Sequence, residues 1–440
     1  MRKLTFLFCA FLALGPLFAQ NALTAEEQSK TIDSLIRSLE DNYVFPKLAE
    51  QMGQQLRQKQ KAGAFKNLTE PVAFADRLTE EIQFVTNDKH LRVRFDPEGA
   101  AQMRAHSEEE EDHEPSPEWL AQMGRDNYGF KEVSILEGNV GYLDLRGFFP
   151  AAFAGEAAAA AMNMLSNADA IIFDLRQNGG GDPGMIQLLT SYLYQAGRGV
   201  HLNSFYHRST NDTSQTWTLP YVPGKRNPDA EVFVLTSNYT FSAAEEFTYN
   251  LKNLERATIV GETTGGGAHP GGTLPIADRF VAFVPNGRAI NPITHTNWEG
   301  TGVSPHVDVA KEKALDVAHQ MALEKLAEKS GSEEDKRYFE WFSSYLKAKN
   351  DPPLLSEEQI QACAGNYGAR NLLYENGQLF YQRNGRPKMA LEPLSPTSFA
   401  LRDDADLRFT VEMENGEAVA LSVESVNGWK ERTERNKTQP

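Results

Sequence analysis

The chain has 440 residues and a formal net charge of −16 at pH 7. This length allows two or three domains, each with its own hydrophobic core, and 40% hydrophobic and 24% charged residues are ordinary for a soluble globular protein. A surface this acidic repels phosphate backbones and anionic lipid heads, so we expect neither nucleic acid nor a membrane surface as a partner.

The first 19 residues have the pattern of an export signal. Arg2 and Lys3 precede an almost wholly apolar run at residues 4–18, and Ala19 is a small residue at a suitable cleavage point. The run is short for a membrane span and no later stretch is long enough, so we expect no span in the mature chain. The sequence predicts a signal peptide at residues 1–19 and a periplasmic or extracellular protein, with an uncleaved anchor as the alternative.

Residues 20–106 predict a small N-terminal helical module, because apolar side chains recur there at helical spacing. These apolar positions are Ile32, Leu35, Ile36, Leu39, Phe74, Leu78, Ile82 and Val85. Residues 108–112 are all acidic and prolines follow closely. Such a run cannot be buried, so we interpret residues 107–130 as a solvated acidic linker.

Residues 131–330 predict an α/β domain, because short β-branched and aromatic runs alternate with helical ones. The expected strands are residues 140–145, 170–175, 231–236, 257–260 and 280–284. The expected helices are residues 151–165, 185–194, 243–254 and 311–329. This alternation favours a mostly parallel sheet.

The last part of the chain has a different pattern. Residues 331–353 predict a helical linker that ends at two prolines, and residues 354–435 predict a separate small antiparallel β domain. Asn-Gly pairs, which suit tight hairpin turns, separate several of its short strands. The pairs are Asn376-Gly377, Asn384-Gly385 and Asn415-Gly416.

Ser242 is the strongest candidate nucleophile. An apolar strand ends at residue 236, small polar residues turn the chain, and a helix begins directly after Ser242. The backbone N–H groups that follow such a serine point at the group that its oxygen attacks. The same position also suits an ordinary helix cap, and Ser237 and Thr240 are rival hydroxyls.

Three glycines at residues 179–181 follow the expected strand at 170–175. Glycines bring the backbone close to a ligand and leave N–H donors unhindered. The Lys-Ser/Thr ending of a phosphate loop is missing, which favours an oxyanion hole over a nucleotide site. A tight structural turn is the alternative.

Together, four motifs in this order resemble the C-terminal-processing peptidases, the S41-type serine peptidases. They are Asp-Leu-Arg-x-Asn-x-Gly-Gly at 174–181, Ser-Ala-x-Glu at 242–245, Val-Gly-Glu-Thr-Thr-Gly-Gly-Gly at 260–267 and Glu-Gly-x-Gly-Val-x-Pro at 299–305. His306 stands where the family has aspartate. The resemblance covers residues 140–317 and implies an α/β core with the crotonase/ClpP-like spiral fold.

One departure indicates the branch. Bacterial members have a Ser-Lys dyad, but the stretch that would hold the lysine reads Gly265-Gly266-Gly267, and glycine cannot act as a base. Residues 88–91, Asp-Lys-His-Leu, resemble the Asp-x-His-Leu motif of the tricorn and interphotoreceptor retinoid-binding protein (IRBP) branch. That branch takes its base from the helical module, so the resemblance implies His90.

The resemblance implies a Ser-His-Glu site. Ser242 attacks a peptide carbonyl, His90 serves as base and Glu299 orients the histidine. The N–H groups of Gly180 and Ala243 hold the oxyanion. Supporting roles fall to Lys89, which could pair with Glu299, to Glu245 and Gly181, and to His269 as a substrate contact or a turn residue.

The expected activity is that of a serine endopeptidase or carboxy-terminal processing-type hydrolase acting on a peptide or unfolded protein. We expect no cofactor and no metal, because the histidines and cysteines lack metal-ligand spacing. A histidine base predicts a rate that rises through an apparent pKa of roughly 6 to 7.5. The alternative is a catalytically silent module of the same fold that binds an apolar ligand or a peptide.

Overall fold

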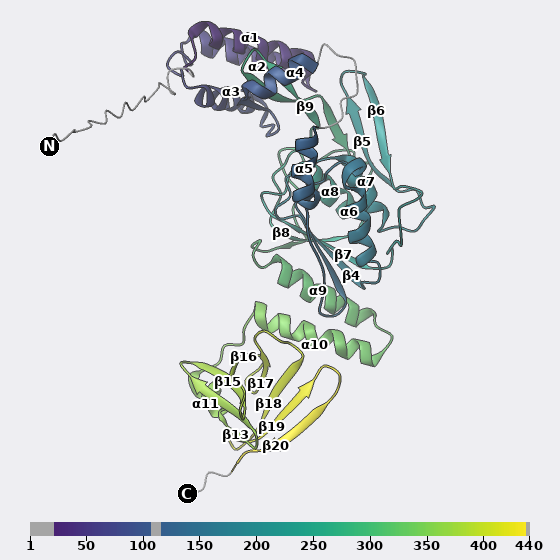
Figure 1. Cartoon of the computed structure of the whole chain (residues 1–440), viewed down its shortest axis with the longest axis vertical. Coiled ribbons are helices and arrows are strands. Elements are labelled where there is room, and N and C mark those ends of the chain that lie inside the picture. Colours follow the sequence, from purple (N-terminus) through teal and green to yellow (C-terminus); the bar gives the residue numbers. More distant parts are fainter. Residues whose placement is uncertain (1–21, 107–115, 437–440) are drawn as a thin grey trace, which may run out of the picture. The chain divides into compact units, whose positions relative to one another are not determined.

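The computed structural model describes residues 22–106 and 116–436, and Figure 1 labels many of their helices and strands. The described residues form two compact units. The first contains the chain up to residue 106 together with Ser204–Ser214 and Gly267–Ile290, and the second contains the other described residues. The signal peptide predicted at residues 1–19 lies outside the described residues.

The first unit begins with the predicted helical module. Its helices are α1 (Ala25–Asn42), α2 (Pro46–Lys61), α3 (Pro71–Thr86) and α4 (Pro97–His106). Thr24 and Glu27 form a capping box at the start of α1. Prolines open α2 and α3, because the first N–H of a helix has no acceptor within the helix and a proline there costs no hydrogen bond. The apolar faces of α1, α2 and α3 share one buried core.

A three-stranded antiparallel sheet completes this core, in the order β1-β10-β9. The strands are β1 (Arg92–Phe95), β9 (Gly271–Ile276) and β10 (Phe280–Pro285). The strand expected at residues 280–284 therefore exists, but it does not belong to the parallel sheet for which we predicted it. It pairs with β1 through Val93 and Ala282 and with β9 through Phe283 and Thr273.

A second small sheet, in the order β11-β5-β6, was not predicted. Its strands are β5 (His201–His207), β6 (Asp212–Trp217) and β11 (Gly287–Ile290). The tip of the β5–β6 hairpin belongs to the first unit, where β11 pairs antiparallel with β5.

The second unit contains the predicted α/β core. Its six-stranded sheet has the order β12-β8-β7-β4-β3-β2; all neighbouring pairs are parallel except β2 with β3. The strands are β2 (Phe130–Leu136), β3 (Val140–Leu145), β4 (Ala170–Asp174), β7 (Glu231–Thr236), β8 (Thr258–Gly261) and β12 (Val307–Asp308).

Both faces of this sheet are covered, which explains why β3, β4 and β7 are nearly continuous apolar runs. Phe173 and Val234 point into a core with α6 (Ala151–Met164), α7 (Pro183–Ser191) and α8 (Ala243–Asn253). Ile172 and Phe233, one residue away on each strand, point into the opposite core with α9 (Ala314–Lys329). The mixed α/β fold class is confirmed.

The residues expected to be linkers contain packed helices. Within residues 107–130, the described part forms α5 (Pro117–Arg125), whose Trp119 ring contacts Phe149 and Phe153. Within residues 331–353, α10 (Glu333–Asn350) buries Trp341 against α9. The Trp341 indole also donates to the carbonyl oxygen of Ala405 at 2.7 Å, so α10 makes packed contacts with the domain that follows.

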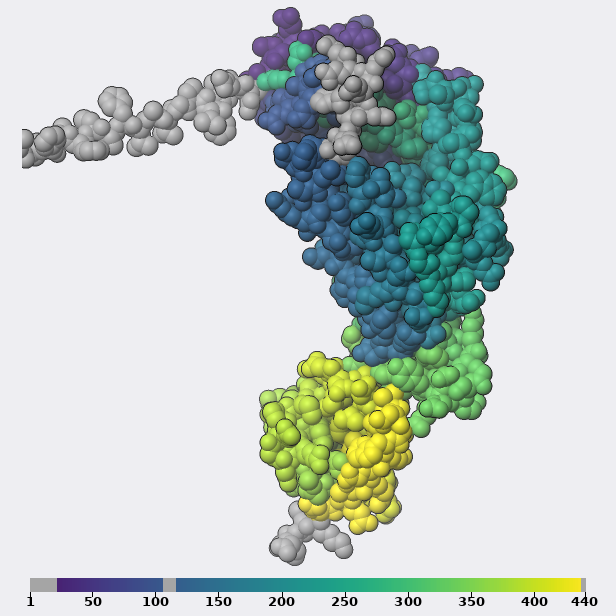
Figure 2. Space-filling model, turned by 45° about the vertical axis from the view of Figure 1, so that its right-hand side comes forward, coloured from purple at the N-terminus to yellow at the C-terminus, as the bar shows by residue number. Residues whose placement is uncertain are grey.

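That C-terminal domain, yellow-green to yellow in Figure 2, is the predicted antiparallel β domain. After α11 (Glu357–Ala362), its strands pair in chain order from β13 to β20. Asn376-Gly377 and Asn415-Gly416 have positive φ at both residues, as hairpin turns of type I′ require. At Asn384-Gly385 only the glycine has a positive φ, and a longer loop joins the strands.

The strands of this domain are β13 (Gly365–Tyr367), β14 (Arg370–Glu375), β15 (Gln378–Arg383), β16 (Met389–Pro393), β17 (Ser398–Leu401), β18 (Leu407–Glu414), β19 (Glu417–Ser425) and β20 (Lys430–Glu434). Across the part of the chain that the structure describes, no helix combines the length and the hydropathy needed to cross a membrane.

Candidate active site

Ser242 lies at a strained strand-to-helix turn in the second unit. β7 ends at Thr236 and α8 begins at Ala243, and Ser242 between them has φ 54° and ψ −120°. A residue with a side chain rarely adopts this backbone conformation, which costs about 1–3 kcal/mol. Strain of this kind at a strand-to-helix turn places a serine hydroxyl at an accessible apex.

The hydroxyls of Ser237 and Thr240, the two rival candidates, form hydrogen bonds that stabilise this turn. Ser237 Oγ donates to the carbonyl oxygen of Arg176 at 2.7 Å, and Thr240 Oγ1 donates to that of Leu175 at 2.8 Å. Both side chains are fully buried, whereas Ser242 is half-buried. These contacts favour Ser242 over Ser237 and Thr240 as the nucleophile.

The loop with the three glycines at residues 179–181, here called the glycine loop, lies directly beside Ser242. A Cβ atom on Gly180 would be 2.8 Å from Ser242 Cβ and 3.0 Å from the Ala243 nitrogen, and one on Gly181 would be 2.0 Å from the Phe148 carbonyl oxygen. Both glycines also have positive φ, at 113° and 140°. Only glycine therefore allows the loop to lie this close to the Ser242 turn at residue 180 and to Phe148 at residue 181.

The two predicted oxyanion donors differ in their present contacts. The Gly180 N–H donates to Asn178 Oδ1 at 2.9 Å, and the buried Asn178 side chain is itself fixed by donation to the Leu145 carbonyl oxygen at 2.9 Å. Ala243 supplies the first amide of α8, where helical N–H groups have no acceptor within the helix and attract negative charge. The Gly180 N–H could donate to an oxyanion only after its hydrogen bond to Asn178 Oδ1 is broken.

Glu245 fixes the backbone of the turn at Ser242. Its side chain is fully buried, and its Oε2 accepts from the Ser242 amide at 2.9 Å. Its Oε1 accepts from Thr264 Oγ1 and from the Gly266 amide, the latter at 2.6 Å. One carboxylate therefore connects the start of α8 to the loop that follows β8.

Glu299 lies on a loop attached to the same segment. The Gly300 amide donates to the Gly266 carbonyl oxygen at 3.1 Å, and the Glu299 amide donates to Asn297 Oδ1 at 3.0 Å. The neighbouring Trp298 is buried, with its ring 5.3 Å from that of Tyr249 on α8. The loop that carries Glu299 is therefore attached both to the loop after β8 and to α8.

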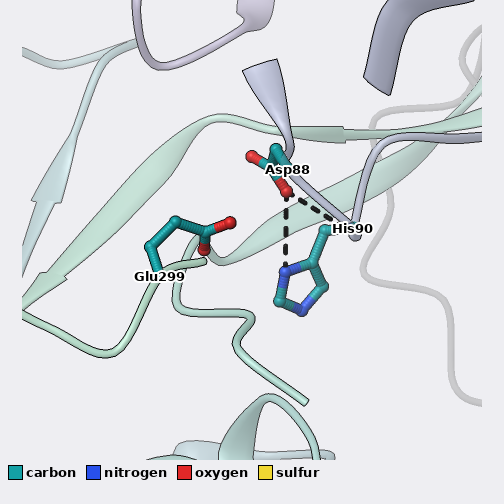
Figure 3. Close-up of side chains that lie close together, drawn as sticks. All are labelled: Asp88, His90 and Glu299. Carbon is teal, nitrogen blue, oxygen red and sulfur yellow. Dashed lines mark hydrogen bonds and ion pairs between the residues drawn. The ribbon is translucent and has the colours of Figure 1, made fainter. Parts of the chain in front are cut away.

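His90 belongs to the first unit, directly after α3. Asn87 ends that helix with a left-handed φ of 58°, and Asp88 Oδ1 then accepts from the His90 amide at 3.0 Å (Figure 3). The His90 ring lies with Nδ1 3.9 Å from the same oxygen and stacks on Phe283 at 5.6 Å. Burial lowers the pKa of His90 to about 4, so the ring is neutral at pH 7.

His269 contacts the same aspartate. Its Nδ1 lies 2.9 Å from Asp88 Oδ2, and the Tyr43 hydroxyl donates to that oxygen at 3.1 Å. The sequence predicted a substrate contact or a turn residue at His269; the structure places its ring against a buried carboxylate, and the prediction itself stays untested. Lys89 is exposed.

The predicted site residues therefore form two groups, one in each unit. Sequence reasoning missed three residues that position them: Asp88, Tyr43 and Asn178. Asp88 and Asn178 stand inside the motifs quoted above, and an Asp or Asn two residues before a turn amide is a known capping pattern that could have identified them. Tyr43 lies far away in sequence and gives no such signal.

Replacing Glu245 should destabilise the second unit. Glu245→Ala removes the acceptor of three donors, and a buried donor without a partner costs about 1–3 kcal/mol. We expect the free energy of unfolding to fall by about 3 kcal/mol or more. Denaturant unfolding at pH 7 measures this loss.

The adjacent Glu246 provides a matched control. It is also buried, but burial raises its pKa from 4.5 to about 8, so it is protonated at pH 7 and Glu246→Gln should be nearly neutral there. Because the pKa of this carboxyl is higher in the folded chain than its ordinary value, the free energy of unfolding of the wild type falls as the pH rises from 4.5 towards 8. Glu246→Gln has no group that titrates there, so its free energy of unfolding should rise relative to that of the wild type across this range. Equal losses at both glutamates would contradict this account.

Comparison with known proteins gives two family models. The model described as peptidase family S41 matches residues 139–309, and the model described as the N-terminal domain of Peptidase_S41 in eukaryotic IRBP matches residues 19–129. The second match agrees with the branch that the Asp-x-His-Leu motif indicated.

Similar solved structures include a Bacteroides fragilis NCTC 9343 chain assigned to the S41 proteases, with 19% identity over 51% of this chain and 59% of that chain (TM-score 0.39). The photosystem II D1 C-terminal processing protease has 16% identity over 66% and 94% (TM-score 0.42). Mature CPAF has 14% identity over 74% and 99% (TM-score 0.43). These TM-scores are low, and the family assignment rests on the two sequence models.

The two models follow one another along the chain and describe the two consecutive parts of one family's architecture. The chain therefore belongs to peptidase family S41.

Proposed function

We propose that the chain is a serine peptidase that hydrolyses peptide bonds of a peptide or unfolded protein, with Ser242 as its nucleophile. The observation that carries this proposal is the strained backbone of Ser242 at the start of α8, beside the glycine loop. Strain persists only where the surroundings fix it, and it concentrates at functional sites. Here Glu245 fixes it through the Ser242 amide.

In the proposed reaction, Ser242 Oγ attacks the carbonyl carbon of the scissile bond and His90 takes the hydroxyl proton. His90 then gives this proton to the leaving amine as the C–N bond breaks, and water releases the acyl group by the same route in reverse. The neutral His90 ring is in the state that a base needs. Glu299 has the role of orienting the histidine in this proposal.

The proposed oxyanion donors are the N–H groups of Ala243 and Gly180. Ala243 lies at the positive end of α8, where a developing negative charge is stabilised. Gly180 joins when the substrate oxygen replaces Asn178 Oδ1 as its acceptor. Gly181 lets the same loop lie against the backbone of Phe148.

Removing the hydroxyl should abolish turnover. We expect Ser242→Ala and Ser242→Gly to lower kcat on a fluorogenic peptide library by about 10³-fold or more. Glycine adopts the conformation of residue 242 without strain, so Ser242→Gly should unfold with a free energy about 1 kcal/mol higher than Ser242→Ala. Ser134→Ala, on β2, is the control and should match the wild type.

Turnover that survives in both Ser242 variants would place the chemistry elsewhere. Peptide binding by a wild-type chain that never hydrolyses its ligand would favour the silent binding module of the same fold. A Ser242→Gly chain less stable than Ser242→Ala would contradict the strain assigned to this turn.

The buried His90 changes the expected pH profile. The ordinary histidine pKa predicted a rise between about 6 and 7.5, but burial lowers the pKa of His90 to about 4. Because the base acts in its neutral form, kcat/KM should rise with pH through about 4 and stay flat from roughly 5 to 8. The measurement is kcat/KM against pH with a neutral peptide, and an inflection near 6.5 would contradict a buried base.

We also propose that the protein is exported to the periplasm or the cell exterior. The support is the pattern of residues 1–19, with two basic residues, an apolar run and a small residue at the cut point. Cell fractionation with N-terminal sequencing tests this. We expect mature protein that begins at Gln20 outside the cytoplasm, and an intact cytoplasmic chain would overturn the proposal.

A further inference from the structure

The Asp88 carboxylate lies between two histidines within the first unit. Its side chain is only 1% exposed, and both of its oxygens accept hydrogen bonds. Oδ1 accepts from the His90 amide, while Oδ2 lies 2.9 Å from His269 Nδ1 and accepts from the Tyr43 hydroxyl. A carboxylate this buried is stable only when such donors compensate for the lost water.

The contacts of Asp88 indicate the direction of its hydrogen bond with His269. Oδ1 accepts from the His90 amide and Oδ2 accepts from the Tyr43 hydroxyl, so we assign the Nδ1–H of His269 as a further donor to Oδ2. The ring is held in place, because its side chain is 7% exposed and Phe45 contacts it edge-on at 5.2 Å. The following residue, Pro270, accepts from the amides of Asn286 and Gly287, which anchors the backbone beside the ring.

The two oxygens of Asp88 belong to one rigid group, so a contact at one oxygen sets the place of the other. His269 and Tyr43 hold Oδ2, and this determines where Oδ1 meets the His90 amide and the edge of the His90 ring. Without the His269 donor, Oδ2 keeps the Tyr43 hydroxyl but loses its second contact, so the carboxylate that accepts from the His90 amide is held less firmly. Asp88 and His269 are 181 positions apart in sequence, so this contact also ties the His90 turn to the loop before β9.

We propose that His269 is a positioning residue for His90, acting through Asp88. This inference rests on the proposed function, in which His90 is the base. Placement of a reacting group matters strongly, since an error of 1 Å can cost about 100-fold in rate. A residue that positions the base should therefore affect kcat and leave substrate binding largely unchanged.

The kinetic test compares His269→Ala, His269→Asn and His269→Gln in the full chain. We expect His269→Ala to lower kcat by about 10- to 100-fold with little change in KM. The shorter amide of asparagine can donate from near the place of Nδ1, whereas that of glutamine reaches past it. His269→Asn should therefore recover most of kcat and His269→Gln should not.

His207→Asn is the matched control, because His207 also belongs to the first unit and its Nε2 contacts only the side chain of Ser214 among the hydrogen bonds of the described structure. It should keep the wild-type kcat. Three results would overturn the proposal: a wild-type kcat in His269→Ala, equal loss in His269→Asn and His269→Gln, or a loss confined to KM, which would indicate a substrate contact.

A second readout does not depend on turnover. In chains with ¹⁵N-labelled histidine, NMR of the ring nitrogens should show His269 protonated at Nδ1. The His90 signals should move in His269→Ala and His269→Gln and return in His269→Asn. Unmoved His90 signals would overturn the positioning role, and if His269→Ala does not fold, the comparison of the two amide variants decides the question.

The two readouts separate the inference from the proposed function. If the His90 signals respond as expected while neither the wild type nor any variant hydrolyses peptides, the proposed function is wrong and the positioning of His90 stands. If peptides are hydrolysed and all His269 variants behave like the wild type in both readouts, the positioning role is wrong and the peptidase stands.

Discussion

The buried carboxylate of Glu245 is the contact on which the arrangement in the second unit depends. It accepts from the amide of Ser242, from the Thr264 hydroxyl and from the Gly266 amide, so it joins the turn at Ser242 to the loop after β8. Gly266 in turn accepts from Gly300, next to Glu299. These contacts fix the backbone around Ser242, so its strained conformation can persist.

Asp88 plays the corresponding part in the first unit. Like Glu245, it is a buried carboxylate that accepts from the amide of the residue it positions, here His90, and from side chains distant in sequence. Each unit thus contains one candidate catalytic side chain on a turn and one buried acid that fixes the turn.

Local sequence patterns predicted most elements but not their partners. The strands at 140–145 and 231–236 were found with correct bounds, because a sheet covered on both faces produces continuous apolar runs. Residues 280–284 have the same kind of pattern, yet the strand pairs with β1 near residue 93, and no periodicity encodes a partner so far away. The contact of His269 with Asp88 was missed for the same reason, whereas the serine turn and glycine loop were local enough to recognise.

The most direct test of the central claim is covalent labelling with a serine-directed fluorophosphonate, followed by mapping of the modified residue by peptide mass spectrometry. We expect one adduct per chain, on Ser242, and no adduct on the buried hydroxyls of Ser237 or Thr240. An adduct on another residue, or peptide hydrolysis by a chain that is never labelled at Ser242, would contradict it.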